Sequence, residues 1–490
     1  MASGIENFVE HTFAPFADKL NSIIFFGIDV GGQEFPLIVA WLVAGALFFT
    51  IYLGFISIRG FPHALRLVRG DYSDPNAPGE VTPFQALSTA VSGTVGVGNI
   101  AHVAICISVG GPGAAFWLLV AGFLGMSSKF AECTLGVKFR RENADGSISG
   151  GPMFYLDQGL KSRGLPRLGK SLAWYYAVCI IIGSLGVGCM FQSNQAYVQL
   201  ANVTGGAEGI LGDKGWLVGL GLASIVFMVI VGGIKSIARV AQTIVPFMAL
   251  TYIGTGLFVI IANMDRIPFA LQQIVTGAFS PEGVSGGMLG VMALGFKRAA
   301  FSNEAGIGSA AVAHAAVRTH HPVTEGFVAL LEPFIDTIIV CSITALVITC
   351  TVYDPANPVG TASGVELTSS AFASVIPWFP YVLALVVFLF AFSTMVAWSY
   401  YGLEGWIYIF GPGKLARHSF NTIFCVFVAL GCVAQLEAIL DFSDGMVFAM
   451  ALANILGLYL LAPVVKAEMQ DYLQKLREKK IVPHGQGDGW

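Results

Sequence analysis

The chain has 490 residues, of which 55% are hydrophobic and only 11% are charged, and its formal net charge is -4. A soluble domain of ordinary size cannot bury so large a share of apolar side chains, so the composition excludes a water-soluble enzyme or binding protein. It predicts an all-α polytopic protein of the plasma (inner) membrane, surrounded by lipid. Neither a nucleic acid nor an obligate protein partner is expected.

About eleven apolar segments approach the length of roughly 20 residues that a bilayer requires. Lys and Arg collect in alternate connecting segments, which hold 20 of the 26 basic residues, whereas the opposite segments hold three. Because cytoplasmic loops are enriched in Lys and Arg, we expect the N-terminus outside and the C-terminus in the cytoplasm. The predicted spans lie at 36–58, 83–109, 114–137, 172–199, 215–233, 241–262, 284–314, 325–350, 379–409, 419–436 and 442–465.

Two of these spans are interrupted at their centres by glycine and polar residues. Residues 93–99, within the span at 83–109, include three glycines, a threonine and an asparagine, and residues 301–309, within the span at 284–314, are similar. Glycine at this density favours unwinding, and lipid does not tolerate the freed N–H and C=O groups unless a cavity, an ion or a polar ligand satisfies them. Each interruption therefore indicates a binding site, with close helix packing through small residues as the alternative.

When the first span is set aside, the other ten divide into two groups of five, and each group begins with an interrupted span. An odd number of spans means that the two groups face opposite ways across the membrane. Matched interruptions in inverted halves are typical of the central site of a secondary transporter. The predicted organisation is an extracellular N-terminus, first helix and cytoplasmic loop at 1–82, a first five-helix repeat at 83–262, a second at 263–466 and a cytoplasmic tail at 467–490.

Five short stretches carry a resemblance to a known family. They are Gly93-Thr94-Val95-Gly96-Val97-Gly98-Asn99-Ile100-Ala101, Gly110-Gly111-Pro112-Gly113 with Phe116-Trp117, Lys129-Phe130-Ala131-Glu132, Gly150-Gly151-Pro152-Met153 with Tyr155, and Phe301-Ser302-Asn303-Glu304-Ala305-Gly306. In this order they resemble the alanine or glycine:cation symporter family, the family of the sodium:alanine symporters, over nearly the whole chain. Two departures concern the size of the pocket: His102 replaces a small glycine, and Leu118-Leu119 replace Met-Trp.

The resemblance implies a leucine-transporter-like fold, a 5+5 inverted repeat plus one extra N-terminal helix, that couples sodium entry to uptake of a small neutral amino acid such as alanine or glycine. A zwitterion needs N–H donors for its carboxylate and acceptors for its ammonium, and an unwound helix offers both. Trp398 would cap the substrate side chain and Gln192 would supply an amide; core packing and interhelical hydrogen bonding are their alternatives. The expected substrate-binding residues are Thr94, Gly96, Gly98, Asn99, Gln192, Phe301, Ser302, Asn303 and Trp398.

The same resemblance implies a site for the co-transported sodium ion, and no other metal is expected. The ligands would be the backbone carbonyls of Ser92, Val95 and Phe390 and the hydroxyls of Ser393 and Thr394. Neutral oxygen atoms of this kind suit sodium, which is a hard cation. The alternative is that the two hydroxyls bond back to the preceding helical turn.

Ionisable side chains inside spans are candidates for function or for buried pairing. Lys129 and Glu132 are three residues apart and are expected to pair with each other. Glu304, inside the second interruption, is the candidate for proton coupling if sodium plays no part. His102 is expected to be a satisfied core residue, and a pH switch at this position is the alternative.

A second charged group precedes the second interruption. Lys297 and Arg298 lie four or five residues before it, and Glu332 and Asp336, one turn apart, are expected to receive these bases. The resulting network would hold or gate the scaffold. Attraction of a substrate carboxylate by Lys297 and Arg298 is the alternative.

Two other classes of protein remain as alternatives to the symporter. A passive channel or facilitator could use the same glycines to line a pore. An intramembrane enzyme could use Ser285 of the pattern Gly283-x-Ser285-x-Gly287, but this pattern lacks the strand-turn-helix context of a nucleophile elbow. We therefore expect no catalytic residues and favour the symporter.

Overall fold

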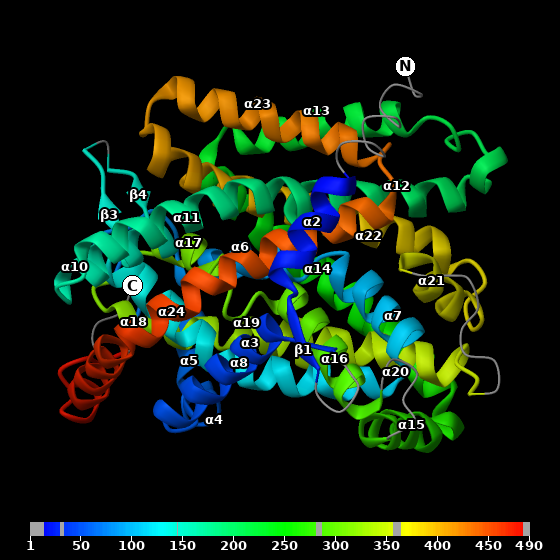
Figure 1. The fold of residues 1–490 in the computed structure, drawn as a ribbon, viewed down its shortest axis with the longest axis horizontal. Coiled ribbons are helices and arrows are strands. Elements are labelled where there is room, and N and C mark those ends of the chain that lie inside the picture. The colour runs from blue at the N-terminus through cyan, green and yellow to red at the C-terminus, as the bar shows by residue number, and fades with distance from the viewer. Residues whose placement is uncertain (1–13, 30–33, 145, 281–286, 356–363, 484–490) are drawn as a thin grey trace.

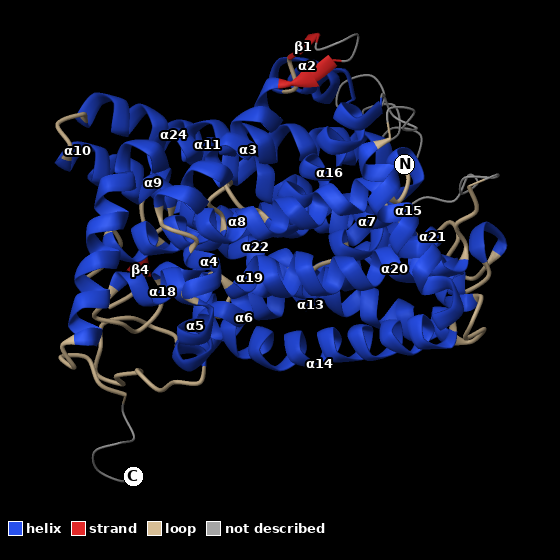
Figure 2. Ribbon diagram, turned by 90° about the horizontal axis from the view of Figure 1, so that it is seen from below, coloured by secondary structure: helices blue, strands red, loops and turns tan. Residues whose placement is uncertain are grey.

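Helices form almost all of the regular structure in the computed structural model, which describes residues 14–29, 34–144, 146–280, 287–355 and 364–483. They lie side by side and across one another in a single bundle (Figures 1 and 2). The all-α prediction is therefore confirmed.

The helices of the first half of the chain begin near the N-terminus and end at α15, the helix before the second interrupted span. They are α2 (Ala14–Ile24), α3 (Leu37–Tyr52), α4 (Ile56–Arg59), α5 (Phe61–Val68), α6 (Pro83–Thr94), α7 (Gly98–Gly110), α8 (Gly113–Lys138), α9 (Pro152–Phe154), α10 (Leu160–Ser162), α11 (Pro166–Leu185), α12 (Phe191–Val203), α13 (Gly215–Ile230), α14 (Gly233–Ala262) and α15 (Ile267–Phe279). The π-helical stretches η2 (Tyr155–Gly159) and η3 (Gly186–Met190) and the 3-10 helices η4 (Gly206–Glu208) and η5 (Met264–Arg266) lie between them.

The second half of the chain is also helical and contains one more π-helical stretch. Its elements are α16 (Gly287–Asn303), α17 (Ala310–Ala315), α18 (Pro322–Ala329), α19 (Leu331–Pro333), η6 (Phe334–Cys341), α20 (Ser342–Thr351), α21 (Val365–Ala373), α22 (Phe379–Phe410), α23 (Lys414–Gly431) and α24 (Leu436–Arg477). Two small antiparallel pairs are the named strands: β1 (Gly27–Asp29) with β2 (Glu34–Pro36), and β3 (Arg141–Glu142) with β4 (Ile148–Ser149).

Each predicted span overlaps a helix or a chain of helices. In the described part of the chain, seven helical stretches are long and apolar enough to cross a membrane, and α3 and α13 are shorter apolar helices. Large apolar side chains are exposed on the outside of the bundle, for example Met228 and Leu250, each 70% exposed. An exterior of this kind is suited to lipid. The protein is thus an integral membrane protein, while the number of crossings stays a prediction.

The first interruption separates the helices α6 and α7. The helix α6 starts with a capping box, in which the Thr82 hydroxyl accepts the Gln85 backbone N–H and the Gln85 side chain accepts the Thr82 N–H. It ends at Thr94, and α7 resumes at Gly98 after a short non-helical turn. The whole apolar window of this helix pair is buried, so the turn lies in the interior of the bundle.

The second interruption separates α16 from α17. Its backbone turns through the left-handed region three times, at Glu304 (φ 56°), Gly306 (φ 87°) and Gly308 (φ 91°). Glycine adopts this conformation freely, but a glutamate there is strained by about 1–2 kcal/mol. The surrounding contacts of Glu304, described below, hold it in place.

Packing brings the two interruptions together. The helix α16 packs against α7, and α17 packs against α6. The long helix α8 lies across α3, α16, α17 and α18, while α22 covers α6, α11, α12 and α14. Both interrupted helices are therefore enclosed by unbroken ones.

The last helix is longer than its predicted span of 442–465. The helix α24 runs without a break from Leu436 to Arg477, and its final turns leave the bundle close to α18 (red in Figure 1). The predicted tail at 467–490 thus begins inside a helix.

Candidate functional site

At the first interruption, a glycine approaches side chains of two other helices. A Cβ atom added to Gly96 would lie 2.5 Å from Thr394 Oγ1 and 3.3 Å from Gln192 Oε1. Real Cβ atoms essentially never come as close as the first of these distances, so only glycine fits at this position. A Cβ atom on Gly98 would lie 4.0 Å from Phe301 Cδ1, which is an ordinary contact.

The amide groups freed by the interruption are bound by side-chain carbonyls. The Gly96 N–H donates to Asn99 Oδ1 at 3.0 Å, and the Val97 N–H donates to Gln192 Oε1 at 3.3 Å. Thr94 instead turns its hydroxyl back to its own helix, towards Ala90 O at 3.3 Å. Asn99 and Gln192 therefore stand where an incoming carboxylate would find N–H donors, and a substrate role for them stays a prediction.

The residues predicted to bind sodium come together between α6 and α22. The Thr394 hydroxyl donates to Ser92 O at 2.9 Å, and the Ser92 hydroxyl donates to Ser393 O at 2.7 Å. The Ser393 hydroxyl donates to Phe390 O at 3.0 Å, within its own helix. Val95 follows the end of α6 and is fully buried. A cluster of neutral oxygen atoms with this arrangement is suited to a monovalent cation, although the Ser393 bond also matches back-bonding to the preceding turn.

Trp398 links the two interruptions. Its indole N–H is shared between Gly93 O at 3.3 Å and Glu304 Oε1 at 3.1 Å. The other carboxylate oxygen of Glu304 accepts a hydrogen bond from the Ser309 hydroxyl. These contacts fix the strained backbone of Glu304, and they place a carboxyl group at the meeting point of α6, α17 and α22.

The carboxylate of Asp336, which was expected to pair with Lys297 or Arg298, lies between the two interruptions. Asp336 accepts from the Asn99 amide at 2.6 Å and from the Ser302 hydroxyl at 2.8 Å. Its neighbour Thr337 accepts from the Asn303 amide at 3.0 Å. The prediction that Asp336 receives Lys297 or Arg298 is therefore wrong, because these polar residues of the interruptions occupy it.

Phe301 is buried beside two other rings. Its ring is 3.9 Å from the ring of His102 and 5.7 Å from that of Phe191, measured between centroids. His102 is fully buried, and its Nδ1 lies 3.5 Å from Arg298 Nη1. His102 Nε2 has no hydrogen-bond partner among the described residues. His102 thus packs its ring against Phe191 and Phe301. It is not the core residue with all its hydrogen bonds made that we expected, because Nε2 has no partner among the described residues.

Buried cations pair differently from the sequence-based expectation. Lys297 and Arg298 contact Asp444 of α24, at 2.9 Å and 3.4 Å, and neither contacts Glu332 or Asp336 as predicted. A carboxylate 146 residues or more away in the sequence carries no local signal that would have identified it. The ion pairs themselves link α16 to α24.

The pairing of Lys129 with Glu132 is also wrong. Lys129 instead binds Glu332 at 3.1 Å, and Glu132 accepts from the Gly306 N–H at 2.8 Å and the Asn454 amide at 2.9 Å. Glu132 of α8 thus binds a backbone N–H group of the second interruption. This contact crosses between helices, so the spacing within α8 could not reveal it.

A further buried group extends this network. Both ring nitrogens of His314 contact carboxylates, Glu325 and Glu332, each at 2.6 Å. Cys133 lies close enough to His314 and Glu332 for the three to enclose a metal ion. Since Glu332 is already neutralised by Lys129, ion pairing accounts for the group without a metal.

The pattern considered for an intramembrane enzyme receives no structural test. Gly283 and Ser285 lie outside the described residues, and only Gly287, at the start of α16, is described.

Comparison with known proteins identifies the family of this chain. Residues 24–484 match the model of the sodium:alanine symporter family. The sodium/alanine symporter AgcS of Methanococcus maripaludis is 36% identical over 89% of this chain and 94% of its own length. The probable sodium/glutamine symporter GlnT of Bacillus subtilis is 31% identical over 91% of this chain and 89% of its own.

Among solved structures, the fold is similar to that of MhsT, a transporter with the leucine-transporter fold that was crystallised with L-phenylalanine. The TM-score is 0.56 at 16% sequence identity, over 79% of this chain and 98% of MhsT. The relatives are transporters and not enzymes, in agreement with the expectation from the sequence. The chain is therefore a member of the sodium:alanine symporter family, a secondary active amino-acid transporter with a leucine-transporter-like fold.

Proposed function

We propose that this transporter couples inward movement of sodium to uptake of a small neutral amino acid, alanine or glycine, by alternating access. The observation that carries the proposal is the close approach of the interrupted helix to α22 at Gly96 and Thr394. It gathers neutral oxygen atoms for an ion directly beside backbone amides that suit a carboxylate. Ion and substrate would therefore each stabilise the conformation that binds the other, which is the basis of coupling.

The sodium site of this proposal consists of Ser92, Val95, Phe390, Ser393 and Thr394. The hydrogen bond from Thr394 to Ser92 O at 2.9 Å supports it, because both oxygen atoms already face one another across two helices. A cation entering between them would replace that hydrogen bond with two oxygen ligands. The interrupted helix would then be tied to α22 by the ion itself.

The substrate site of this proposal lies on the other side of the same interruption. Its residues are Thr94, Gly96, Gly98, Asn99, Gln192, Phe301, Ser302, Asn303 and Trp398. All nine are buried, and hydrogen bonds and ring contacts already connect most of them. The His102 ring, whose centroid lies 3.9 Å from that of Phe301 with the ring planes tilted by 33°, takes up space beside this group and supports a preference for small side chains.

The wider arrangement follows from the same proposal. The first repeat would occupy 83–262 and the second 263–466. Residues 1–82 would comprise an extracellular N-terminus, the first transmembrane helix and a cytoplasmic loop, and 467–490 would be a cytoplasmic tail. Orientation is testable with Lys161→Cys, since this side chain is exposed on the short helix α10, within the basic segment before α11. An impermeant maleimide should label it in inverted membrane vesicles and not in intact cells.

The decisive experiment is uptake of labelled alanine, glycine and glutamine into liposomes that contain the purified protein. We expect accumulation of alanine or glycine above equilibrium with an inward sodium gradient, and not with potassium in its place. Accumulation driven only by a pH gradient would replace sodium by protons and direct attention to Glu304. Equilibration without accumulation would indicate a passive facilitator. Preference for glutamine, the substrate in the name of GlnT, would contradict the proposed substrate size.

A further inference from the structure

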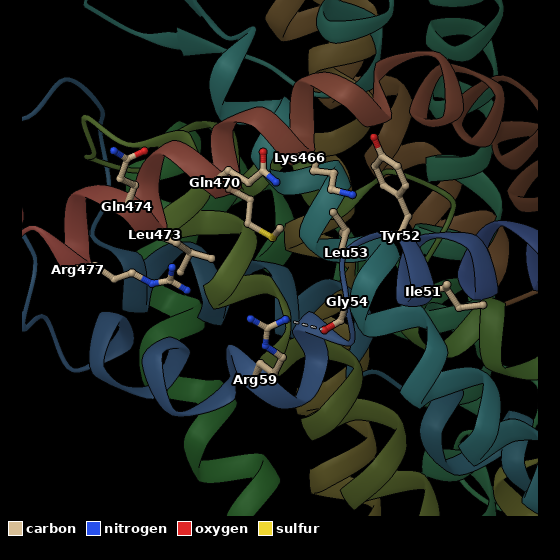
Figure 3. A pocket seen from close by; sticks show the side chains of 11 residues that line it. Ile51, Tyr52, Leu53, Gly54, Arg59, Lys466, Gln470, Leu473, Gln474 and Arg477 are labelled. Atoms are coloured by element: carbon tan, nitrogen blue, oxygen red, sulfur yellow. Dashed lines mark hydrogen bonds between the residues drawn. The ribbon is translucent and has the colours of Figure 1, made fainter.

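A basic cavity lies at the end of the first apolar helix, far along the chain from both interruptions. It has a volume of about 620 Å³ and is formed between the end of α3, α4 and the final turns of α24. Figure 3 shows the side chains of α24 along one wall and residues 51–59 along the other. Its lining residues include three cations, Arg59, Lys466 and Arg477.

The cations come from two separate helices and share one space. On α24, Lys466, Gln470, Gln474 and Arg477 follow one another at helical spacing and so lie on one face. Arg59 faces them from α4, where it donates only a 3.3 Å hydrogen bond to Gly54 O. Among the described residues, none of the three cations has a carboxylate within ion-pair distance.

The acidic residues of the same helix end are already bound to other bases. They are Glu468 with Lys138, Asp471 with Lys475 and Glu478 with Lys480, each pair at 2.6 Å. The Glu478 carboxylate also accepts from the Gln474 amide. The cavity therefore keeps a net positive charge, which favours an anion that comes from outside the chain.

Apolar side chains beside the cavity indicate that the anion carries an apolar tail. Ile51, Phe55 and Ile58 point outward and are 67%, 49% and 60% exposed, at the end of an apolar helix. Ile58 also lines an apolar groove of about 300 Å³ between α4, α8 and η6, whereas the next residue, Arg59, lines the basic cavity. A charged head and an apolar tail would therefore find neighbouring sites across α4.

We propose that this cavity binds the phosphate group of an anionic phospholipid, with an acyl chain in the adjacent apolar groove. Arg59 and Arg477 supply the planar donors that suit phosphate oxygens, and Lys466 supplies a third charge. The Lys466 ammonium lies 4.3 Å from the centre of the Tyr52 ring, so the end of α3 holds it at the mouth of the cavity. A bound lipid joins α3 and α4 to the projecting end of α24.

Native mass spectrometry of the detergent-solubilised full chain tests this site without reference to transport. The probes are phosphatidylglycerol, phosphatidylcholine and soluble glycerol 1-phosphate. We expect one tightly retained phosphatidylglycerol and no comparable retention of phosphatidylcholine. In Arg59→Gln/Lys466→Gln/Arg477→Gln, retention should fall by about a hundred-fold, since each charge near a lipid headgroup contributes roughly a five-fold gain in affinity.

A matched control removes three exposed bases from the segment between α10 and the start of α11, as Lys161→Gln/Arg163→Gln/Arg167→Gln, and should retain the lipid. The single variant Arg477→Gln, on an exposed helix end, covers the case in which the triple variant fails to fold, and it should lose roughly five-fold. Equal retention of both phospholipids, or unchanged retention in the variants, overturns the site. Competition by glycerol 1-phosphate at the same concentration as the lipid makes it a free-anion site and overturns the lipid proposal.

Discussion

The side-chain amide of Asn99 donates to the carboxylate of Asp336 across 2.6 Å, and this contact ties the first interrupted helix to the π-helical stretch η6. Asp336 also accepts from Ser302 of the second interruption. One buried carboxylate therefore connects both interruptions. A movement that separates the two helices must first release this group.

The first prediction concerns that carboxylate. Asp336→Asn should lower uptake at least roughly ten-fold, because hydrogen bonds to a charged group contribute about 1.5–3 kcal/mol. Initial rates of labelled alanine uptake at equal protein content measure it. Thr349→Val on α20 is the control, since Thr349 bonds only within its own helix. Wild-type rates in Asp336→Asn would show that the link is dispensable.

The second prediction uses the two glycines of the first interruption. Gly96→Ala should abolish uptake, since its Cβ would overlap Thr394 Oγ1 and such overpacking costs about 1–3 kcal/mol. Gly98→Ala should remain active, because its Cβ would make only an ordinary contact with Phe301, whereas Gly98→Leu should be inactive. Gly254→Ala, where nothing lies within 4 Å, is the control. Activity in both Gly96→Ala and Gly98→Leu would remove the interruption from the mechanism.

The third prediction tests the proposed sodium site. Thr394→Ala should raise the sodium concentration for half-maximal uptake by about five-fold. The reason is that losing one oxygen ligand of the ion costs about 1 kcal/mol of binding free energy. The comparison is Ser399→Ala on the same helix, whose hydroxyl bonds only to Val396 O. An unchanged sodium dependence in Thr394→Ala would move the ion elsewhere.

The fourth prediction concerns the selectivity of the pocket. His102→Gly should admit larger neutral amino acids, because it removes the ring whose centroid lies 3.9 Å from that of Phe301. Competition of unlabelled leucine and methionine against labelled alanine measures the change, and inhibition should rise at least roughly ten-fold, as expected for a pocket that gains a few methylene groups of space. The same competition profile in variant and wild type would show that His102 does not limit the substrate.

The fifth prediction concerns pH and lies outside the membrane spans. Burial, with the nearby Arg66 charge, lowers the pKa of His63 from 6.5 to about 4, and its Nε2 contacts the Tyr472 hydroxyl at 2.9 Å. The folded state thus binds fewer protons than the unfolded state between these values, so stability should fall as the pH drops from about 6.5 towards 4. Thermal unfolding midpoints at pH 7.5 and 5 measure it. His63→Gln should show a smaller drop, and an equal drop would assign the effect to other groups.

Sequence patterns predicted the interruptions well, because glycine and polar residues in an apolar span have few structural explanations. The approach of Gly96 to Thr394 joins a residue predicted for the substrate and one predicted for sodium, and both roles stay predictions. The sequence did not predict which carboxylate each buried lysine or arginine would pair with. Lys129 has Glu132 within one turn, yet it binds Glu332 from another helix. Such choices depend on which helices touch, and sequence spacing reports only contacts within one helix.

The continuous helix α24 has a mechanical consequence. Its 42 residues correspond to about 63 Å at 1.5 Å per residue. Two bonds fasten it to α16 and to the second interruption, since Asp444 binds Lys297 and the Asn454 amide donates to Gly306 O; further along, Lys466 borders the basic cavity. Pro463, inside the helix between Asn454 and Lys466, is a point at which the helix can bend. Displacement of the second interruption is therefore passed directly to the segment between Asp444 and Asn454, and it reaches Lys466 only across that proline.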